Sequence, residues 1–256
     1  MNEYPTYTFD RLASSNTTLW RLAEEGAVHG TAVIALEQSA GRGRLGKSWL
    51  GTGDKGLYCS ILVRPRLSPE TYPQLTLASG LAVALALEAL TGLSCQLKWP
   101  NDVYVCGRKC GGILTEASPG SREEQKRFAV IGVGLNVNAE AEDFSAELID
   151  KATSLFLQSG KVYDRSVVFE QVRRAILEQV ERLVAQGLGS ILTDWRERDF
   201  LLGKETTWLA CDGKIVTGIA LGPDDQGQLQ VRDRQGNVHA VLSGDVRLAA
   251  KGESPR

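Results

Sequence analysis

The chain has 256 residues, of which 43% are hydrophobic and 23% are charged, and its formal net charge is -2 at pH 7. This length accommodates one large domain, or one domain of ordinary size with a small appendage. The near-zero net charge excludes a protein that grips nucleic acid through a globally basic surface, so any anion-binding site has to be local.

The N-terminal segment and the longest apolar stretch indicate the cellular location of the protein. Residues 1–16 have neither a basic start nor an apolar run followed by small residues, so they do not predict a secretory signal. The stretch Leu75–Leu90 is interrupted by polar residues and is shorter than the roughly 20 residues that span a bilayer. We expect a buried helix there, no membrane association, and a cytoplasmic protein.

The cysteines are an odd number and widely spread: Cys59, Cys95, Cys106, Cys110 and Cys211. A chain of this size folds without disulfides, so the pattern favours reduced thiols. Cys106 and Cys110 lie four residues apart, but neither His29 nor His239 stands at ligand spacing from them. We therefore predict no protein-bound metal site.

Apolar periodicity and turn residues divide the first half of the chain into elements. The predicted elements are a helix from Ser15 or Asn16, a strand at Thr31–Leu36, a glycine-rich loop at Glu37–Lys55, a strand at Leu57–Val63 and a helix at about Pro69–Leu90. The second half continues with strands at Ser94–Lys98, Arg108–Glu116 and Phe128–Asn136 and a helix at Val162–Ala185. Short loops between these strands favour a mixed or antiparallel sheet flanked by helices, an α+β fold.

From Gly203 the sequence changes to short strands separated by turn residues such as Asp212-Gly213 and Gly236-Asn237. This texture predicts a small antiparallel β-barrel of about five strands. We place a domain boundary near Leu202, giving domains at 1–202 and 203–256.

Residues Gly41–Ser48, GRGRLGKS, fit the phosphate-loop pattern G-x-x-x-x-G-K-[ST] literally. In a phosphate loop, however, the lysine and serine begin a helix whose N-terminus faces the phosphates. Here Gly51, Gly53 and Gly56 follow Ser48 and disfavour a helix. The pattern alone therefore does not identify a P-loop nucleotide hydrolase or kinase.

The same loop has the composition of a different anion-binding loop. It contains three glycines, three basic residues and a tryptophan: Gly41, Gly43, Gly46, Arg42, Arg44, Lys47 and Trp49. Glycines let backbone amides approach a ligand closely, the cations attract its negative charge, and the indole offers a face on which an adenine can stack. A flexible surface loop with solvated charges is the structural alternative.

Other motifs accompany this loop in a fixed order. They are Ser14-Ser15-Asn16, Gln38, Lys98-Trp99-Pro100-Asn101-Asp102, Lys109-Cys110-Gly111-Gly112-Ile113-Leu114 and Gly132-Val133-Gly134-Leu135-Asn136. With GRGRLGKSW, the series closely resembles the motifs of biotin protein ligases, also called biotin holoenzyme synthetases. Since the series begins at Ser14, it resembles the monofunctional type without an N-terminal DNA-binding domain, and we expect no direct DNA binding. The resemblance also implies a class II synthetase-like catalytic domain with a C-terminal SH3-like barrel.

The resemblance assigns roles to particular residues. Biotin would be bound by Ser14, Ser15, Asn16, Gln38, Gly41, Arg42, Gly43, Lys109, Gly111 and Gly112. ATP would be bound by Arg44, Lys47, Trp49, Asn101 and Asn136. The catalytic residues would be Lys109, Arg42, Arg44 and Asp102, with Asp102 orienting or helping to deprotonate an incoming lysine.

Each of these motifs also has a structural explanation. Ser14–Asn16 are residues that cap helices, and the Pro-Asn-Asp sequence is a common turn that leaves Trp99 for the core. Lys109 at a strand end resembles an ordinary solvated charge. Gly132–Gly134 suggests a dinucleotide-binding turn, but position 137 is valine rather than the third glycine.

By resemblance, the reaction has two steps. The biotin carboxylate attacks the α-phosphate of MgATP to give biotinyl-adenylate and pyrophosphate, and a lysine of a biotin carboxyl carrier protein then attacks the adenylate. A lipoate- or octanoate-protein ligase of similar fold, a transcriptional regulator and a non-catalytic binding module are the competing interpretations. The family includes monomers and homodimers, and the sequence does not discriminate between them.

Overall fold

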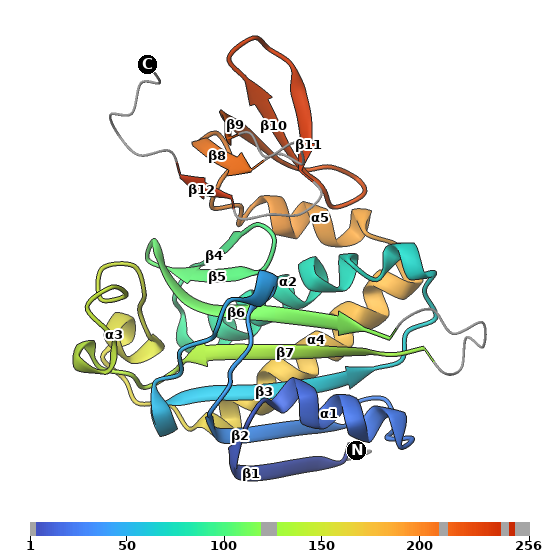
Figure 1. The fold of residues 1–256 in the computed structure, drawn as a ribbon, viewed down its shortest axis with the longest axis vertical. Coiled ribbons are helices and arrows are strands. Elements are labelled where there is room, and N and C mark those ends of the chain that lie inside the picture. Colours follow the sequence, from blue (N-terminus) through green and yellow to red (C-terminus); the bar gives the residue numbers. More distant parts are fainter. Residues whose placement is uncertain (1–3, 119–126, 210–214, 242–245, 249–256) are drawn as a thin grey trace.

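The computed structural model describes residues 4–118, 127–209, 215–241 and 246–248. A seven-stranded sheet with flanking helices forms the larger part of the molecule, and a second, five-stranded sheet forms the smaller part (Figure 1). Cys211 and the Asp212-Gly213 turn lie outside the described residues.

The larger sheet has the strand order β1-β2-β3-β7-β6-β5-β4. Its strands are β1 (Thr6–Leu12), β2 (Ala32–Gln38), β3 (Gly56–Val63), β4 (Cys95–Lys98), β5 (Asp102–Val105), β6 (Arg108–Ala117) and β7 (Ala129–Asn136). Strands β1 and β2 pair in parallel, whereas all the other neighbours pair antiparallel. The predicted mixed sheet is therefore confirmed.

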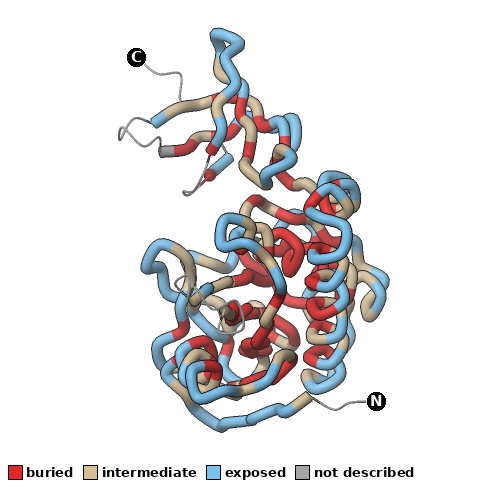
Figure 2. Tube along the Cα trace, turned by 90° about the vertical axis from the view of Figure 1, so that its right-hand side faces the viewer, coloured by how far each residue is buried: buried red, intermediate tan, exposed pale blue. Residues whose placement is uncertain are grey.

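Helices cover the two faces of this sheet differently. On one face, α1 (Ser15–Glu24) packs through Leu19 and Ala23 against Val33, Leu62 and Val130. On the other face lie α2 (Gln74–Thr91) and α4 (Arg165–Gln186), which contact each other and enclose the main core (Figure 1). Buried residues accordingly concentrate between the sheet and these helices (Figure 2). The candidate site lies on the part of the first face that α1 does not cover.

The smaller sheet has the order β11-β10-β9-β8-β12 and is antiparallel throughout. Its strands are β8 (Glu205–Leu209), β9 (Ile215–Pro223), β10 (Leu229–Asp233), β11 (Val238–Val241) and β12 (Arg247–Leu248). Five antiparallel strands are as predicted. Among the described residues β11 does not pair with β12, so the structure shows an antiparallel sheet and not a closed barrel.

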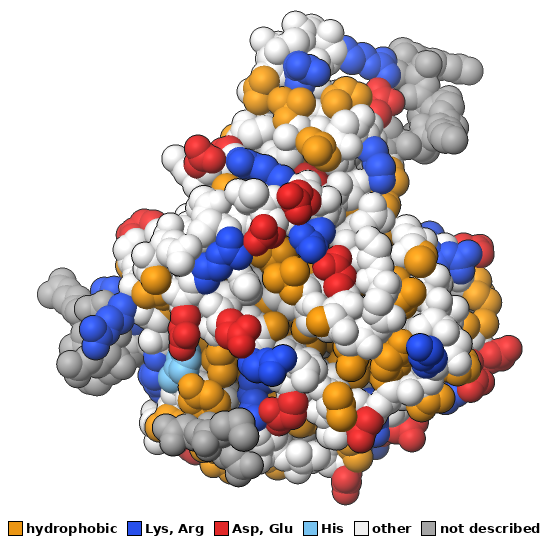
Figure 3. Space-filling view, turned by 180° about the vertical axis from the view of Figure 1, so that it is seen from behind, with side chains coloured by type: hydrophobic (Ala, Val, Ile, Leu, Met, Phe, Trp, Pro, Cys, Tyr) orange, Lys and Arg blue, Asp and Glu red, His pale blue; other side chains and the backbone are white. Residues whose placement is uncertain are grey.

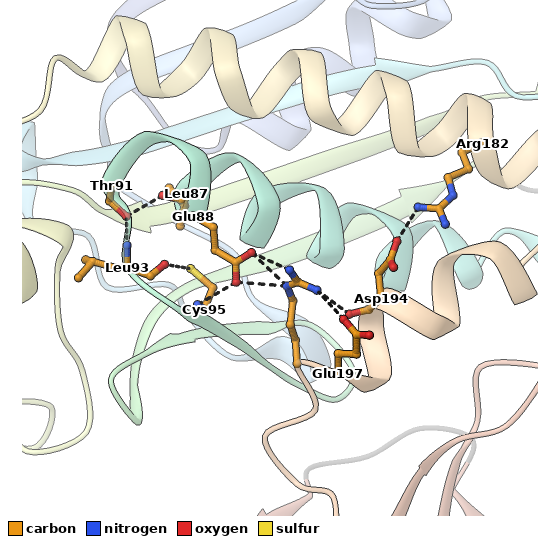
Figure 4. A network of polar contacts seen from close by, with 9 residues as sticks. Leu87, Glu88, Thr91, Leu93, Cys95, Arg182, Asp194 and Glu197 are labelled. Atoms are coloured by element: carbon orange, nitrogen blue, oxygen red, sulfur yellow. Dashed lines mark hydrogen bonds and ion pairs between the residues drawn. The ribbon is translucent and has the colours of Figure 1, made fainter.

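A half-buried polar network joins α2 to the segment of the chain that precedes the smaller sheet (Figure 4). Glu88, on the largely buried α2, forms an ion pair with Arg198, whose Nη2 lies 2.7 Å from the Glu88 Oε2. Arg198 follows α5 (Gly189–Arg196) and also donates a hydrogen bond to the Asp194 carbonyl at 2.9 Å. The Glu88 carboxylate raises the pKa of the Arg198 guanidinium, chiefly through the hydrogen bonds between these two side chains. A charge on the core helix is thereby neutralised.

The predicted elements agree with the structure except at the edges and in short segments. The sequence interpretation missed β1, β5, α3 (Leu155–Ser159) and α5. Strand β1 is solvent-exposed along nearly its whole length, so burial imposes no pattern on it. Helix α2 begins at Gln74 rather than near Pro69, because residues 69–71 form a 3₁₀ turn and Pro73 is the N-cap.

Helix α2 is also long and apolar enough to cross a membrane by composition, but 61% of it is buried inside the fold. The prediction of a buried helix is thus confirmed. On the face of the molecule opposite to the view of Figure 1, basic and acidic side chains are interspersed (Figure 3).

Candidate active site

The glycine- and arginine-rich loop folds as a small hairpin rather than as the start of a helix. Arg42 and Ser48 form an antiparallel bridge, and the Trp49 amide donates to the Gly41 carbonyl at 2.9 Å. Leu45, at the tip, has a φ of 56°, which is uncommon for a residue with a side chain. The hairpin geometry confirms that the phosphate-loop pattern was a coincidence of sequence.

The far end of this loop is anchored by a buried tyrosine. The Thr52 amide donates a hydrogen bond to the Tyr58 hydroxyl at 2.6 Å, and a Cβ at Gly51 or Gly56 would collide with the same hydroxyl. Burial raises the pKa of the Tyr58 phenol, so the hydroxyl stays neutral. Gly51 and Gly56 thus have a packing reason, since they let the loop close over Tyr58.

Glycines on β6 and β7 open the face of the sheet under the loop. Gly112 pairs with Gly134 across the two strands. A Cβ at Gly134 would lie 2.7 Å from Trp49 Cε2, and one at Gly112 would lie 3.2 Å from Trp49 Cζ3. Likewise, a Cβ at Gly132 would lie 2.2 Å from Asn16 Oδ1. The Gly-Val-Gly sequence is therefore part of a strand whose glycines admit side chains from two other motifs.

Trp49 packs against this glycine floor. Its Nε1 is buried and has no hydrogen-bond partner within the described part of the chain. The Lys109 ammonium lies 5.5 Å from the centre of its ring, within range of a cation–π interaction. A buried indole N–H without a partner is costly, and this one lies against β7, where a Cβ at Gly134 would be 3.0 Å away.

Lys109 and Asp102 form an ion pair within the cavity. The Lys109 Nζ lies 2.6 Å from Asp102 Oδ1, and the two side chains are 36% and 17% exposed. Asp102 projects from β5 and Lys109 from β6, next to a register shift between Val103 and Tyr104. The lysine is thus held in place by a carboxylate rather than freely solvated.

The KWPND segment fixes one wall of the site. Asn101 donates from Nδ2 to the Ile113 carbonyl at 2.8 Å, and the Ile113 amide donates back to the Asn101 carbonyl at 2.9 Å. Trp99 is 4% exposed, as expected of a core residue. Its Nε1 donates to the Gly227 carbonyl at 3.0 Å and so connects this wall to the smaller sheet.

The N-terminal Ser-Ser-Asn motif is buried beneath the cavity. Ser15 accepts a hydrogen bond from Ser60 at 2.8 Å and donates from its amide to Gln38 Oε1 at 2.8 Å. Ser14 occupies the N-cap position of α1, but its side chain makes no capping hydrogen bond. The expectation that these residues cap the helix through their side chains is therefore wrong for Ser14, because its side chain lines the cavity instead.

Together these elements enclose a cavity of about 160 Å³. The predicted site residues that line it are Ser14, Ser15, Asn16, Gln38, Arg42, Gly43, Arg44, Lys47, Trp49, Asn101, Asp102, Lys109 and Gly112. The structure thus brings together residues that are separated by up to 98 positions in the chain.

Three predicted site residues do not line this cavity. Gly111 packs against Leu135 and the Gly134 carbonyl, and Gly41 lies against the Trp49 backbone. Asn136 is buried and donates from Nδ2 to the Thr153 carbonyl at 3.0 Å. Their predicted ligand contacts stay predictions.

The sequence interpretation overlooked two polar residues of the site, Ser60 and Glu116. Ser60 is fully buried in the apolar strand β3, and its hydroxyl contacts both Ser15 and Asn16. A single serine within the run LYCSILV was the available signal, since a buried hydroxyl needs a partner. Glu116 lies two residues after the KCGGIL motif and contacts Asn16 and Arg42.

Comparison with known proteins agrees with this geometry. Residues 8–136, which carry every motif described above, match the biotin/lipoate A/B protein ligase family. The chain belongs to this family. The family match confirms the resemblance inferred from the order of the motifs.

Relatives in this family cover nearly the whole chain. The bifunctional ligase/repressor BirA of Bacillus spizizenii is 34% identical over 239 residues, covering 93% of this chain and 72% of the relative. The biotin–[acetyl-CoA-carboxylase] ligase of Mycobacterium tuberculosis is 34% identical and covers 91% of this chain and 85% of its own. The biotin protein ligase of Aquifex aeolicus, solved in complex with biotin and ATP, superposes with a TM-score of 0.80 at 31% identity over 96% of this chain and 99% of the other. The family's fold thus extends through the smaller sheet.

Proposed function

We propose that this protein is a biotin protein ligase, which activates biotin with MgATP and transfers it to a lysine of a biotin carboxyl carrier protein such as that of acetyl-CoA carboxylase. One observation carries the proposal. Lys109, Arg42, Arg44 and Lys47 converge on a single cavity that is floored by glycines and by Trp49. Two relatives that span most of the chain are themselves named biotin–[acetyl-CoA-carboxylase] ligase.

The first step joins two anions, and charge is its main obstacle. The biotin carboxylate attacks the α-phosphorus of ATP, a P–O bond forms, and pyrophosphate leaves with the electron pair of the broken P–O bond. Lys109 and Arg44 would stabilise the negative charge that builds on the phosphate oxygens. A lysine suits this task as a compact point charge, and its pairing with Asp102 holds it in place before the substrates arrive.

Magnesium fits this site as a part of the substrate. Asp102 is the only carboxylate among the described residues that line the cavity, and it is already paired with Lys109. Mg²⁺ is commonly bound through substrate phosphates and one or two carboxylates rather than by a cage of protein ligands. We therefore propose that it enters as MgATP, with the loop cations and Asn101 completing the nucleotide site.

In the second step, the amine of the carrier lysine attacks the carbonyl carbon of the adenylate, an amide forms, AMP leaves and the amine loses a proton. Asp102 would orient the incoming lysine or accept that proton. The hairpin loop would shield the adenylate from water in the interval between the two steps. Its glycines permit the movement, and its cations contact the intermediate.

The remaining parts of the proposal concern organisation and location. We propose that residues 1–202 form the catalytic domain and that residues 203–256 form a second domain, since the two sheets divide the chain there. The Trp99–Gly227 hydrogen bond connects the second domain to the wall of the site. We place the protein in the cytoplasm, where ATP and carboxylase carriers are available.

The deciding experiment is biotin-dependent exchange of labelled pyrophosphate into ATP by the purified protein. We expect exchange with biotin and none without it. Exchange that requires lipoate or octanoate, and is absent with biotin, would refute the proposal and favour the lipoate branch of the family. Binding of biotin without any exchange would instead indicate a non-catalytic binding module.

A further inference from the structure

An arginine of the loop is joined to the sheet by two hydrogen bonds. Arg42 Nη2 lies 2.8 Å from Glu116 Oε1, and Arg42 Nη1 donates to Glu116 Oε2 at 3.2 Å. Both terminal guanidinium nitrogens and both carboxylate oxygens take part, and such a bidentate pair restrains the arginine strongly. Glu116 lies on β6, so the pair connects the glycine-rich loop to a strand of the larger sheet.

Glu116 is itself fixed by a buried partner. Its Oε2 also accepts a hydrogen bond from Asn16 Nδ2 at 2.9 Å. The other amide hydrogen of Asn16 goes to the Leu114 carbonyl at 3.2 Å, and Asn16 Oδ1 accepts from Ser60 at 2.6 Å. Asn16 is only 4% exposed. Its donors are thus both used within the protein, and Glu116 has one preferred position.

The network continues to the residues predicted to hold the biotin ring. The single hydroxyl hydrogen of Ser60 is shared between Asn16 Oδ1 and Ser15 Oγ, and Ser15 donates from its amide and its hydroxyl to Gln38 Oε1. A single chain of hydrogen bonds therefore runs from Gln38, through the floor of the cavity, to the loop cation Arg42. Buried networks of this kind have few alternative arrangements, because an unmatched donor or acceptor is costly.

We propose that Glu116 is a positioning residue, which holds Arg42 over the cavity and thereby slows the escape of the activated intermediate. The inference rests on the proposed function. Arg42 is half exposed and projects from a glycine-flanked hairpin, so without a partner its long side chain would sample many rotamers. The carboxylate of Glu116 removes that freedom and places the positive charge where the adenylate phosphate forms.

The test is the Glu116→Gln variant. Glutamine keeps an oxygen that can accept from Asn16, but it removes the negative charge that holds Arg42. After the adenylate has been formed from labelled biotin and MgATP, its release is followed by dilution into unlabelled biotin and rapid filtration. We expect release to be faster by roughly threefold to tenfold, the range for one charge-assisted pair that is partly exposed to solvent.

Two comparisons separate positioning from a general structural effect. Glu205→Gln removes the carboxylate of another glutamate–arginine pair, Arg234–Glu205 at 3.1 Å in the smaller sheet, and should leave release unchanged. In the Arg42→Ala background, Glu116→Gln should change release by less than about twofold, because the residue it positions is gone.

The outcomes distinguish this inference from the proposed function. Equal adenylate retention in Glu116→Gln and the unmodified protein, with normal biotin-dependent exchange in both, would refute the role of Glu116 and leave the proposed function standing. Additive effects of the Arg42 and Glu116 substitutions would also refute it. Absence of exchange in the unmodified protein would refute the proposed function, and this inference with it.

Discussion

Asp199 has a largely buried carboxylate at the junction between the two sheets, and removing its charge should change how stability depends on pH. Its Oδ1 accepts a hydrogen bond from the Leu201 amide at 2.8 Å, whereas its Oδ2 is buried and has no partner in the described structure. Burial raises the pKa of this carboxyl from 3.8 to about 6, although Lys204 nearby acts in the opposite direction. The folded state therefore disfavours ionised Asp199.

The size of the effect follows from the two pKa values. The pKa of the Asp199 carboxyl is 3.8 in the unfolded chain and about 6 in the folded protein, so the folded protein binds the proton more tightly. The contribution of Asp199 to stability is therefore fully present below the lower value and is lost as the pH rises through the upper one. At about 1.4 kcal/mol for each pH unit, the loss amounts to roughly 3 kcal/mol.

The measurement is urea unfolding of the unmodified protein and of Asp199→Asn at about pH 4 and about pH 7. We expect the free energy of unfolding of the variant, relative to the unmodified protein, to rise by roughly 2.4 kcal/mol between these pH values, because pH 4 already lies just above the lower pKa of 3.8. Asp225→Asn is the control, because that carboxylate is 95% exposed. If the free energies of unfolding of Asp199→Asn and the unmodified protein instead differ by the same amount at both pH values, that result would show that folding does not raise the pKa of Asp199.

Two further predictions concern the cavity. Lys109→Ala should lower biotin-dependent pyrophosphate exchange by roughly 100-fold to 1000-fold while the fold is retained, because it removes the charge that stabilises the phosphate oxygens; near-normal exchange would exclude Lys109 from the mechanism. Gly134→Ala places a methyl group 2.7 Å from Trp49 Cε2 and should displace the indole, raising the KM for ATP roughly tenfold at a stability cost of about 1–3 kcal/mol. Gly189→Ala, where a Cβ meets nothing within 4 Å, is the matched control, and equal KM values in the two variants would argue against a role of Trp49 in nucleotide binding.

Several features could be predicted because they depend on neighbouring residues along the chain. The apolar runs of β3 and β7 and the periodicity of α4 identified those elements directly. The glycines after Ser48 excluded a phosphate loop, and the order of the motifs identified the family. Local pattern failed for β1, whose exposed side chains carry no burial signal, and for the short helices α3 and α5.

The sequence by itself determined which residues carry charge and flexibility near Gly41–Trp49, but only the tertiary structure decided what they contact. Positions 132 and 134 are glycines because a Cβ there would collide with Asn16 and Trp49, which come from distant segments. The partner of Arg42 is Glu116, 74 positions away. Such contacts depend on which strands become neighbours in the sheet, and strand order is set by the burial of whole faces rather than by any local pattern.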